Sequence, residues 1–111
     1  MKDIFVFGSN LAGRHGKGAA KFAREKHGAI YGQGEGLQGN SYAIPTKDGL
    51  LKTRSLRDIE ASIARFVEFA KSSPDMRFNI TRVGGGLAGY DWDMDIRPLF
   101  PAEMPNNCRF I

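Results

Sequence analysis

Ile4-Phe5-Val6-Phe7 is a short apolar run, followed at once by Gly8-Ser9-Asn10-Leu11-Ala12-Gly13-Arg14-His15-Gly16-Lys17-Gly18 and then by Ala19-Ala20-Lys21-Phe22-Ala23-Arg24-Glu25-Lys26. A wholly apolar run of this kind is typical of a strand buried on both faces of a parallel sheet. Residues 19–26 are good helix formers with apolar side chains three to four apart, and Gly28 follows shortly after them. The stretch therefore predicts a strand, a glycine-rich loop and a helix.

The middle of the chain predicts one further strand and a long helix. Residues 28–39 are rich in glycine and are expected to be irregular, unless short strand fragments around Ile30-Tyr31 interrupt them. Ser41-Tyr42-Ala43-Ile44 is expected to be a strand that stops at Pro45, and residues 46–53 to form a polar turn or hairpin. Ser55 is expected to cap a helix over residues 56–71, whose apolar stripe follows the 3.6-residue period.

Residues 78–83 alternate apolar and polar side chains and predict a strand that runs directly into Gly84-Gly85-Gly86-Leu87-Ala88-Gly89-Tyr90. Residues 91–100 are expected to form a short helix or turn, with Leu99 and Phe100 packed inward, and residues 107–111 a final strand. Strands that alternate with helices indicate one α/β domain, spanning residues 1–111, with a mainly parallel sheet.

Composition narrows the classes of protein. The chain has 111 residues, 41% of them hydrophobic, which suffices for the core of one domain. Cys108 is the only cysteine, so no internal disulfide can form, and we expect it to be a packing residue in a reducing compartment. No apolar stretch approaches the length of about 20 residues that spans a bilayer. We expect a cytoplasmic protein without a membrane partner, whose net charge of +4 permits anionic ligands.

The two glycine-rich loops are the candidate binding site. Ligands of open α/β sheets bind outside the carboxyl ends of the strands, so both loops are expected to meet there and close around one ligand. Glycines leave backbone N–H groups and a helix N-terminus open to an anion, and a phosphate fits such a loop; glycine loops that only make tight turns are also common. The expected ligand-binding residues are Gly8, Ser9, Gly13, Arg14, Gly16, Lys17, Gly18, Gly84, Gly85, Gly86, Leu87, Ala88, Gly89 and Tyr90.

Asn10 and His15 are the candidate catalytic residues. His15 lies in the first loop, where an imidazole can transfer protons near neutral pH, and Asn10 can orient a ribose hydroxyl or a water molecule, or only cap a turn. Tyr90 is as well suited to packing as to stacking on a ligand. Asp91, Asp93 and Asp95 lack the further ligands of a calcium loop, and neither a metal nor a cofactor is expected.

The two loops resemble those of the macro domain family. The resemblance rests on residues 6–20, from the first strand through Asn10 and the glycine-rich loop to a helix that starts with small residues, and on residues 80–90, a later strand and glycine-rich loop. Tyr42-Ala43-Ile44-Pro45-Thr46 lies where the family has a core strand. The chain looks like a small, stand-alone, macro-like protein of a kind found in bacteria and their phages.

The resemblance implies a three-layer α/β/α fold with a mainly parallel or mixed central sheet. It also implies that ADP-ribose or a related nucleotide diphosphate binds with its pyrophosphate between the loops, and some members hydrolyse a phosphate ester or an ADP-ribosyl linkage. By position, Asn10 would face the distal ribose, Gly16 to Gly18 and Gly86 to Gly89 would contact phosphates, and Tyr90 would flank the ribose. Lys17 stands where hydrolytic members often carry an aspartate.

A second hypothesis is a nucleic-acid-binding module without catalysis. Arg14, Lys17 and Arg82 would then hold backbone phosphates on the same loops. A third is another nucleotide-processing α/β enzyme of the lysine-decarboxylase-like kind, although that family's threonine and glutamate pattern is absent from this chain.

Overall fold

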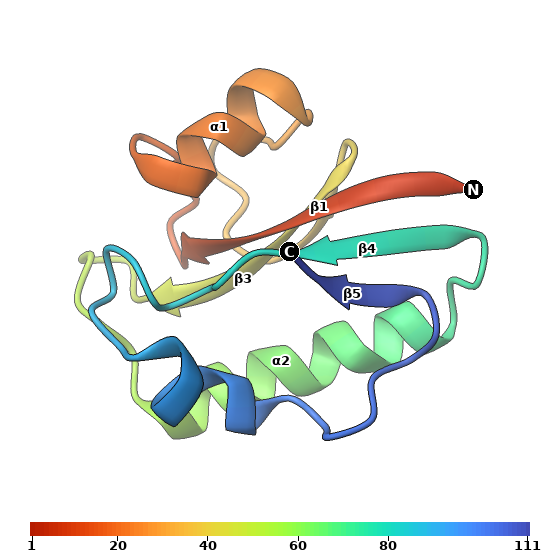
Figure 1. Ribbon diagram of the computed structural model, residues 1–111. Coiled ribbons are helices and arrows are strands. Elements are labelled where there is room, and N and C mark those ends of the chain that lie inside the picture. Colours follow the sequence, from red (N-terminus) through yellow and green to blue (C-terminus); the bar gives the residue numbers. More distant parts are fainter.

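The computed structural model describes residues 1–111 as a five-stranded mixed sheet with helices packed on it (Figure 1). The strands are β1 (Lys2–Asn10), β2 (Gly36–Gln38), β3 (Ser41–Lys47), β4 (Met76–Ile80) and β5 (Cys108–Phe110). They lie in the order β2-β3-β1-β4-β5. Strand β1 is parallel to both its neighbours, β4 is parallel to β5, and only β2 is antiparallel, at one edge. The expected α/β class and mainly parallel sheet are confirmed.

The apolar run of β1 is buried from both sides because the two α-helices lie on opposite faces of the sheet (Figure 1). Ile4 and Val6 belong to the larger core cluster, which α2 (Leu56–Lys71) completes. Phe7 belongs to the smaller cluster, which the small side chains of α1 (Gly18–Lys26) cover. The central strand therefore ends between two packed layers, and this fixes the position of the loop that follows it.

Helix α2 follows the sequence pattern closely. The hydroxyl of Ser55 accepts a hydrogen bond from the backbone N–H of Asp58 at 3.2 Å, which is the expected N-cap. Its apolar stripe is buried against the sheet, together with one polar residue, Ser62. Neither the nine residues of α1 nor the sixteen of α2 give a helix with the length and apolar character that crossing a membrane requires.

The expectation that Pro45 ends a strand is wrong. Strand β3 continues through Pro45 to Lys47, because β2 pairs only with residues 41–43 and leaves the outer side of β3 open beyond them. The carbonyl of Pro45 points to that open side, where it accepts a hydrogen bond from the Arg54 guanidinium at 2.7 Å. The missing N–H of proline therefore interrupts no ladder.

Two further segments differ from expectation, and a third, residues 91–100, contains the expected short helix or turn. The short strand in the glycine-rich region is Gly36–Gln38, and residues 30–31 are not a strand. Strand β4 ends at Ile80, so residues 81–83 belong to the loop that follows. Residues 92–96 form a π-helical turn, η1 (Trp92–Ile96), and residues 97–99 a 3-10 turn, η2 (Arg97–Leu99). Phe100 is buried as expected, whereas Leu99 is half-buried.

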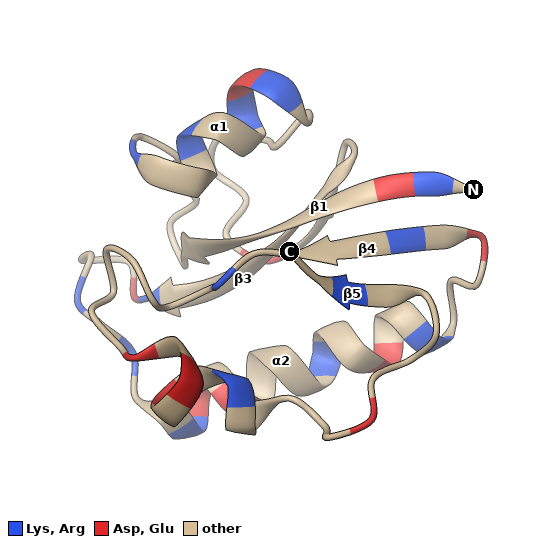
Figure 2. Ribbon diagram, viewed as in Figure 1, with Lys and Arg blue, Asp and Glu red and all other residues tan.

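The face of the sheet that carries α1 is only partly covered. On the same face, β1, β4 and β5 present a polar ladder, in which the Asp3 carboxylate pairs with Arg77 at 2.7 Å and Asn79 accepts from Arg109 at 2.6 Å. Figure 2 shows charged residues side by side on these three strands. The hydrogen bond with Arg77 lowers the pKa of Asp3, which suits an exposed ion pair. No further helix covers this region, so the layering is less complete than the expected three-layer fold.

Cys108 lies in β5, half-buried against the larger core cluster. Burial raises the pKa of its thiol to about 11, so the thiolate is scarce at neutral pH. Both observations agree with the expected packing role.

Candidate functional site

A cleft of about 820 Å³ lies where the carboxyl ends of β1, β3 and β4 meet. Its volume is within the roughly 300–1,000 Å³ that small-molecule sites occupy. Both glycine-rich loops contribute to it, as the position of a site at this edge requires (Figure 1). The expected residues that line it are Gly8, Ser9, Asn10, Arg14, Gly16, Lys17, Gly18, Gly84, Gly85, Gly86, Leu87 and Ala88.

Four expected site residues do not line the cleft, and two of them are glycines that shape the loops. Gly13 has a φ of 69°, and a Cβ there would lie 2.3 Å from the backbone N of Gln33, so this glycine allows two segments of backbone to touch. Gly89 has a φ of 84° and its N–H donates to the carbonyl of Gly86 at 3.0 Å, which closes a turn in the second loop.

Tyr90 packs beside the larger core cluster, and its hydroxyl donates to the carbonyl of Arg54 at 2.7 Å. The packing role is therefore the one that the structure shows, and the expected contact with a ribose does not follow from its position. Its hydrogen bond instead holds the end of the second loop against the segment that precedes α2.

His15 faces away from the cleft. Its imidazole is completely buried, with an edge-to-face contact to Phe7 at 5.3 Å between ring centroids, and neither ring nitrogen has a hydrogen-bond partner. Burial lowers the pKa of His15; the backbone of Gln33 opposes this shift and the charge of Arg24 adds to it. A ring in this position does not reach a ligand in the cleft, so the expected proton transfer by His15 has no geometric support.

Asn10 braces the first loop. Its amide oxygen accepts from the backbone N–H of Arg14 at 2.9 Å, and its amide nitrogen donates to the carbonyl of the same residue at 3.0 Å. The turn-capping interpretation of Asn10 is therefore the one that the structure shows. Because the amide is nine-tenths buried and holds Arg14 from both sides, it fixes the direction in which the Arg14 side chain leaves the loop.

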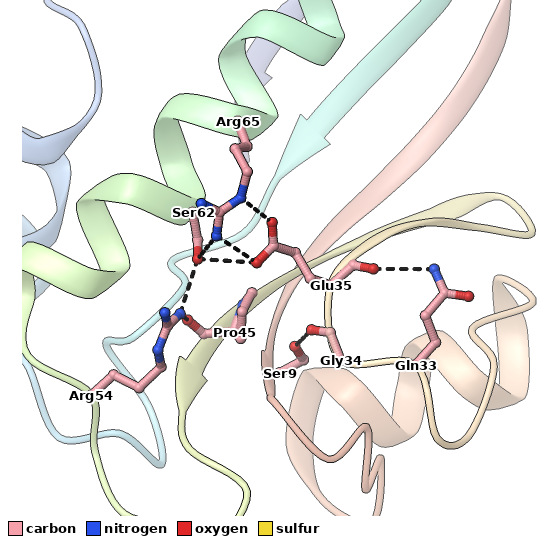
Figure 3. A network of polar contacts seen from close by, with 8 residues as sticks. All are labelled: Ser9, Gln33, Gly34, Glu35, Pro45, Arg54, Ser62 and Arg65. Atoms are coloured by element: carbon pink, nitrogen blue, oxygen red, sulfur yellow. Dashed lines mark hydrogen bonds and ion pairs between the residues drawn. The ribbon is translucent and has the colours of Figure 1, made fainter.

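The end of β1 is anchored to α2 through a polar network (Figure 3). The hydroxyl of Ser9 donates to the carbonyl of Gly34, and the next residue, Glu35, pairs with Arg65 of α2 at 2.6 Å. The buried hydroxyl of Ser62 donates to Glu35 at 3.2 Å and accepts from Arg54 at 2.9 Å. The hydrogen bonds from Arg65 lower the pKa of Glu35, so this carboxylate stays ionised. The network holds the segment 33–35 against the end of β1.

Helix α1 begins in the cleft without a side-chain cap. Lys17 occupies the N-cap position in extended backbone, and its side chain makes no capping hydrogen bond. The first N–H groups of a helix have no partner within it, and those of Gly18, Ala19 and Ala20 belong to residues that line the cleft. The positive end of the helix dipole therefore adds to the charge of the site.

The second loop is shaped by close approaches and reaches across to α1. Gly84 has a φ of 77°, and a Cβ there would lie 2.9 Å from Cδ1 of Ile96. At the tip of the loop, Cδ1 of Leu87 lies 3.6 Å from where a Cβ on Gly18 would be, so the leucine leans over the start of α1. The hydroxyl of Thr53 donates to the carbonyl of Ala88 at 2.9 Å, which ties the loop to the hairpin after β3.

The charges of the lining have one sign. Arg14, Lys17, Lys47 and Arg82 line the cleft, and none of their side chains makes a salt bridge or a hydrogen bond within the protein. No aspartate or glutamate lines it. Elsewhere three cations form salt bridges, among them Arg65 with Glu35 and Arg77 with Asp3, while others, such as Lys26 and Arg57, form none. Acidic residues gather instead on the turn η1, outside the lining of the cleft (Figure 2).

The hydroxyl groups of the lining are already used as donors. Ser9 donates to Gly34, Thr46 to the carbonyl of Ser9 at 3.4 Å, and Thr81 to the carbonyl of Val6 at 2.7 Å. Each bond joins neighbouring segments of the site. These side chains thus hold the walls of the cleft together, and the groups that remain for a ligand are the cations and the backbone N–H groups.

Sequence reasoning missed the part of the lining that comes from β3, from the hairpin after it, from the first turn of α1 and from the residues just after β4. The missed residues are Ala19, Ala20, Thr46, Lys47, Leu51, Thr81 and Val83, whereas Arg82 was expected only for a nucleic-acid contact. A usable signal existed for Thr46 and Lys47, because they end a strand that is parallel to β1, and the carboxyl ends of parallel strands meet at one edge of the sheet. The expectation that Pro45 ended the strand concealed it.

The alternating aspartates after Tyr90 lie outside the cleft and serve the turn that contains them. The carboxylate of Asp91 accepts from the backbone N–H of Met94 at 2.8 Å, and that of Asp95 accepts from the N–H of Asp91 at 3.0 Å. They are turn carboxylates, as expected.

Comparisons of this chain with protein-family models, curated proteins and solved structures find no match.

Proposed function

We propose that this protein binds ADP-ribose or a related nucleotide diphosphate in the cleft between its two glycine-rich loops. The observation that carries the proposal is the set of four unpaired cations, Arg14, Lys17, Lys47 and Arg82, around one cleft whose lining holds no carboxylate. Gathering like charges in one place is unfavourable unless an anion neutralises them. A diphosphate supplies that charge in a group small enough to lie between the loops.

The two glycine loops and the cations have separate roles in the proposal. Backbone N–H groups at the start of α1 and those of Gly84 and Gly86 hydrogen-bond phosphate oxygens, for which glycine permits the closest approach. Arginine offers paired donors that match a phosphate, while lysine contributes a point charge. The role of Asn10 is to hold the Arg14 segment in place rather than to contact the ribose.

We propose binding without hydrolysis. The lining contains no carboxylate, imidazole or thiol, and its hydroxyls donate within the protein, so no side chain is placed to activate water or protonate a leaving group. The resemblance of the loops to the macro domain family supports the choice of ADP-ribose as the first ligand to test, and with it a macro-like arrangement of the layers. In a phosphate-release assay with ADP-ribose phosphate ester, we expect no release above background.

The test is a calorimetric titration of ADP-ribose into the wild type and two variants. Lys17→Gln removes a cation at the start of α1, and Lys26→Gln removes one at the other end of the same helix. We expect Lys17→Gln to weaken binding about threefold to tenfold and Lys26→Gln to leave it unchanged. Wild-type protein that shows neither heat of binding nor a rise in melting temperature at millimolar ADP-ribose would refute the proposal.

Nucleic-acid binding is the second candidate, because Arg14, Lys17 and Arg82 are all unpaired and lie at one cleft. Oligonucleotide binding would release several counterions, so its affinity would fall steeply with salt. A competition titration separates the two functions. If a short oligonucleotide binds more tightly than ADP-ribose and displaces it, the cleft serves nucleic acid.

A further inference from the structure

The hairpin between β3 and α2 holds an apolar side chain in an unfavourable backbone conformation. Leu51 is the only residue other than glycine with a positive φ, at 64°. A leucine in this left-handed region is strained, because its Cβ approaches the following carbonyl oxygen. The turn around it is well formed, since the Asp48 carboxylate accepts from the N–H groups of Leu50 and Lys52 at 2.8 and 2.9 Å. The conformation is thus built into the hairpin.

No burial in the core compensates for this strain. Leu51 belongs to neither core cluster, and 46% of it is exposed to solvent. It does line the cleft. A strained, exposed leucine at the mouth of a binding cleft has the properties of a residue kept for contact with a ligand.

A second exposed leucine stands on the same rim. Leu87 is 65% exposed, lines the cleft and leans over Gly18. The bond from Thr53 to the carbonyl of Ala88 joins the two segments, each partner lying within two residues of a leucine. The hairpin and the second loop therefore hold two apolar side chains in the lining of the cleft that the four cations share.

The lining offers little with which to read the hydrogen-bonding edge of a base. The Asn10 amide is held by Arg14, the hydroxyls of Ser9, Thr46 and Thr81 donate within the protein, and no carboxylate is present. A base has an apolar face whatever its identity, and apolar contact does not distinguish one base from another.

We propose that Leu51 and Leu87 form an apolar clamp that covers the base or ribose of a bound nucleotide, and that the cleft accepts nucleoside diphosphates with little regard to the base. This inference rests on the proposed function, since it assigns the phosphates to the cations and the rest of the nucleotide to the two leucines. It names the ligand class as a nucleoside diphosphate group with any base, free or carrying a further sugar.

The test compares Leu51→Asn with Leu50→Asn in titrations of ADP, GDP, UDP, CDP and inorganic pyrophosphate. Asparagine accepts a positive φ, so Leu51→Asn relieves strain and leaves the fold at least as stable as the wild type. We expect it to weaken each nucleotide about tenfold while pyrophosphate binding stays unchanged, because only apolar contact is lost. Leu50 is 79% exposed and does not line the cleft, so Leu50→Asn should change neither nucleotide affinity nor pyrophosphate affinity.

A second variant, Leu87→Ser, should also lose affinity for the nucleotides and keep its affinity for pyrophosphate. In the wild type, the four nucleotides should bind within about threefold of one another and more tightly than pyrophosphate. The clamp is overturned if Leu51→Asn and Leu87→Ser leave nucleotide affinity unchanged while pyrophosphate still binds. Indifference to the base is overturned if one nucleotide binds more than about tenfold tighter than the others. If no phosphate compound binds the wild type, the proposed function itself fails.

Discussion

Adjacent side chains in the first glycine loop have opposite surroundings. Arg14 projects into the cleft without a partner, whereas His15 is completely buried against Phe7. The backbone between them is fixed by the Asn10 amide, which holds Arg14 on both its N–H and its carbonyl. A charge inside the protein at position 15 would therefore strain the segment that carries Arg14.

His15 should make the protein sensitive to acid. Burial lowers the pKa of His15 below its ordinary value of 6.5, so the unfolded chain binds more protons as the pH falls through that value. The contribution of His15 to stability is complete above pH 6.5 and is lost as the pH falls through the lowered pKa. We expect the free energy of unfolding to decline as the pH falls below about 6.5. Denaturant titrations at several pH values measure it.

The variant His15→Leu should lose this decline, because leucine fills the same apolar site without a titrating group. His27, at the end of α1, provides the comparison, since it is only half-buried. His27→Asn should keep the decline of the wild type. An acid-induced decline that persists in His15→Leu would assign the sensitivity to another group.

Gly34 is a position where any side chain should be costly. A Cβ there would lie 2.4 Å from the carbonyl oxygen of Asn10 and 2.5 Å from that of Leu11, both of them backbone atoms that cannot move aside alone. We expect Gly34→Ala to lower the free energy of unfolding by about 3 kcal/mol or more and to weaken ligand binding with it. Gly49→Ala, where no atom lies within 4 Å, should change stability by less than about 0.5 kcal/mol. Equal effects of the two substitutions would contradict the close packing of Gly34 on β1.

Among the elements, β1 and α2 could be predicted because their signals are local. The wholly apolar run from Ile4 to Phe7 indicates a strand that is buried on both faces. Ser55 and the apolar stripe that follows it indicate α2 within one continuous segment. Strand β2 and the passage of β3 through Pro45 depend on what lies beside them. Residues 36–38 become a strand only by pairing with residues 41–43, and Pro45 is tolerated because β2 has ended there.

The same distinction explains the candidate site. The glycine loops are contiguous in sequence, and the rule that ligands bind at strand ends brought them together. Whether a loop residue faces the cleft depends on contacts with distant segments, such as Gly13 against Gln33 or Tyr90 with Arg54. Composition does not contain that information, so the loops were predicted correctly as segments and only in part as side chains.

The network between the segment 33–35 and α2 should stabilise the protein in a manner that depends on pH. The pKa of Glu35 is lowered chiefly by its hydrogen bonds from Arg65. The contribution of Glu35 to stability is therefore complete above about pH 4.5 and is lost as the pH falls through the lowered pKa. We expect Glu35→Gln to cost about 1 kcal/mol at neutral pH and nothing at low pH, where the wild type is protonated as well. Thermal unfolding measured from neutral to acid pH tests this.

Glu60→Gln is the matched control, because Glu60 is an exposed carboxylate on α2 that makes no salt bridge. It should leave the pH dependence of stability unchanged. Ser62→Ala should cost about 1–3 kcal/mol, since it removes a buried hydroxyl that joins Glu35 to Arg54. A cost for Glu35→Gln that does not change with pH would show that the carboxylate charge contributes nothing.

Across the molecule, charge is distributed unevenly in a way that follows the proposed function. On the open face of the sheet, Asp3 pairs with Arg77 and Asn79 with Arg109. On the other face, Arg65 of α2 pairs with Glu35. The net charge of +4 coexists with a cleft whose four cations have no partner. Proteins commonly accept reduced stability at a binding site for the sake of function. The cleft should therefore be less stable empty than occupied.

Removing one of these cations should stabilise the free protein and weaken its response to ligand. We expect Lys47→Gln or Arg82→Gln to raise the melting temperature by about 1–3 °C at low salt, because fewer like charges share the cleft. The difference should vanish near molar salt, where the screening length falls to about 3 Å. Arg57→Gln, an exposed cation of α2 that does not line the cleft, should change neither quantity. Melting curves with and without pyrophosphate at two salt concentrations measure both effects. If the variants melt below the wild type at low salt, the cations stabilise the empty fold and the cleft was not assembled around an anion.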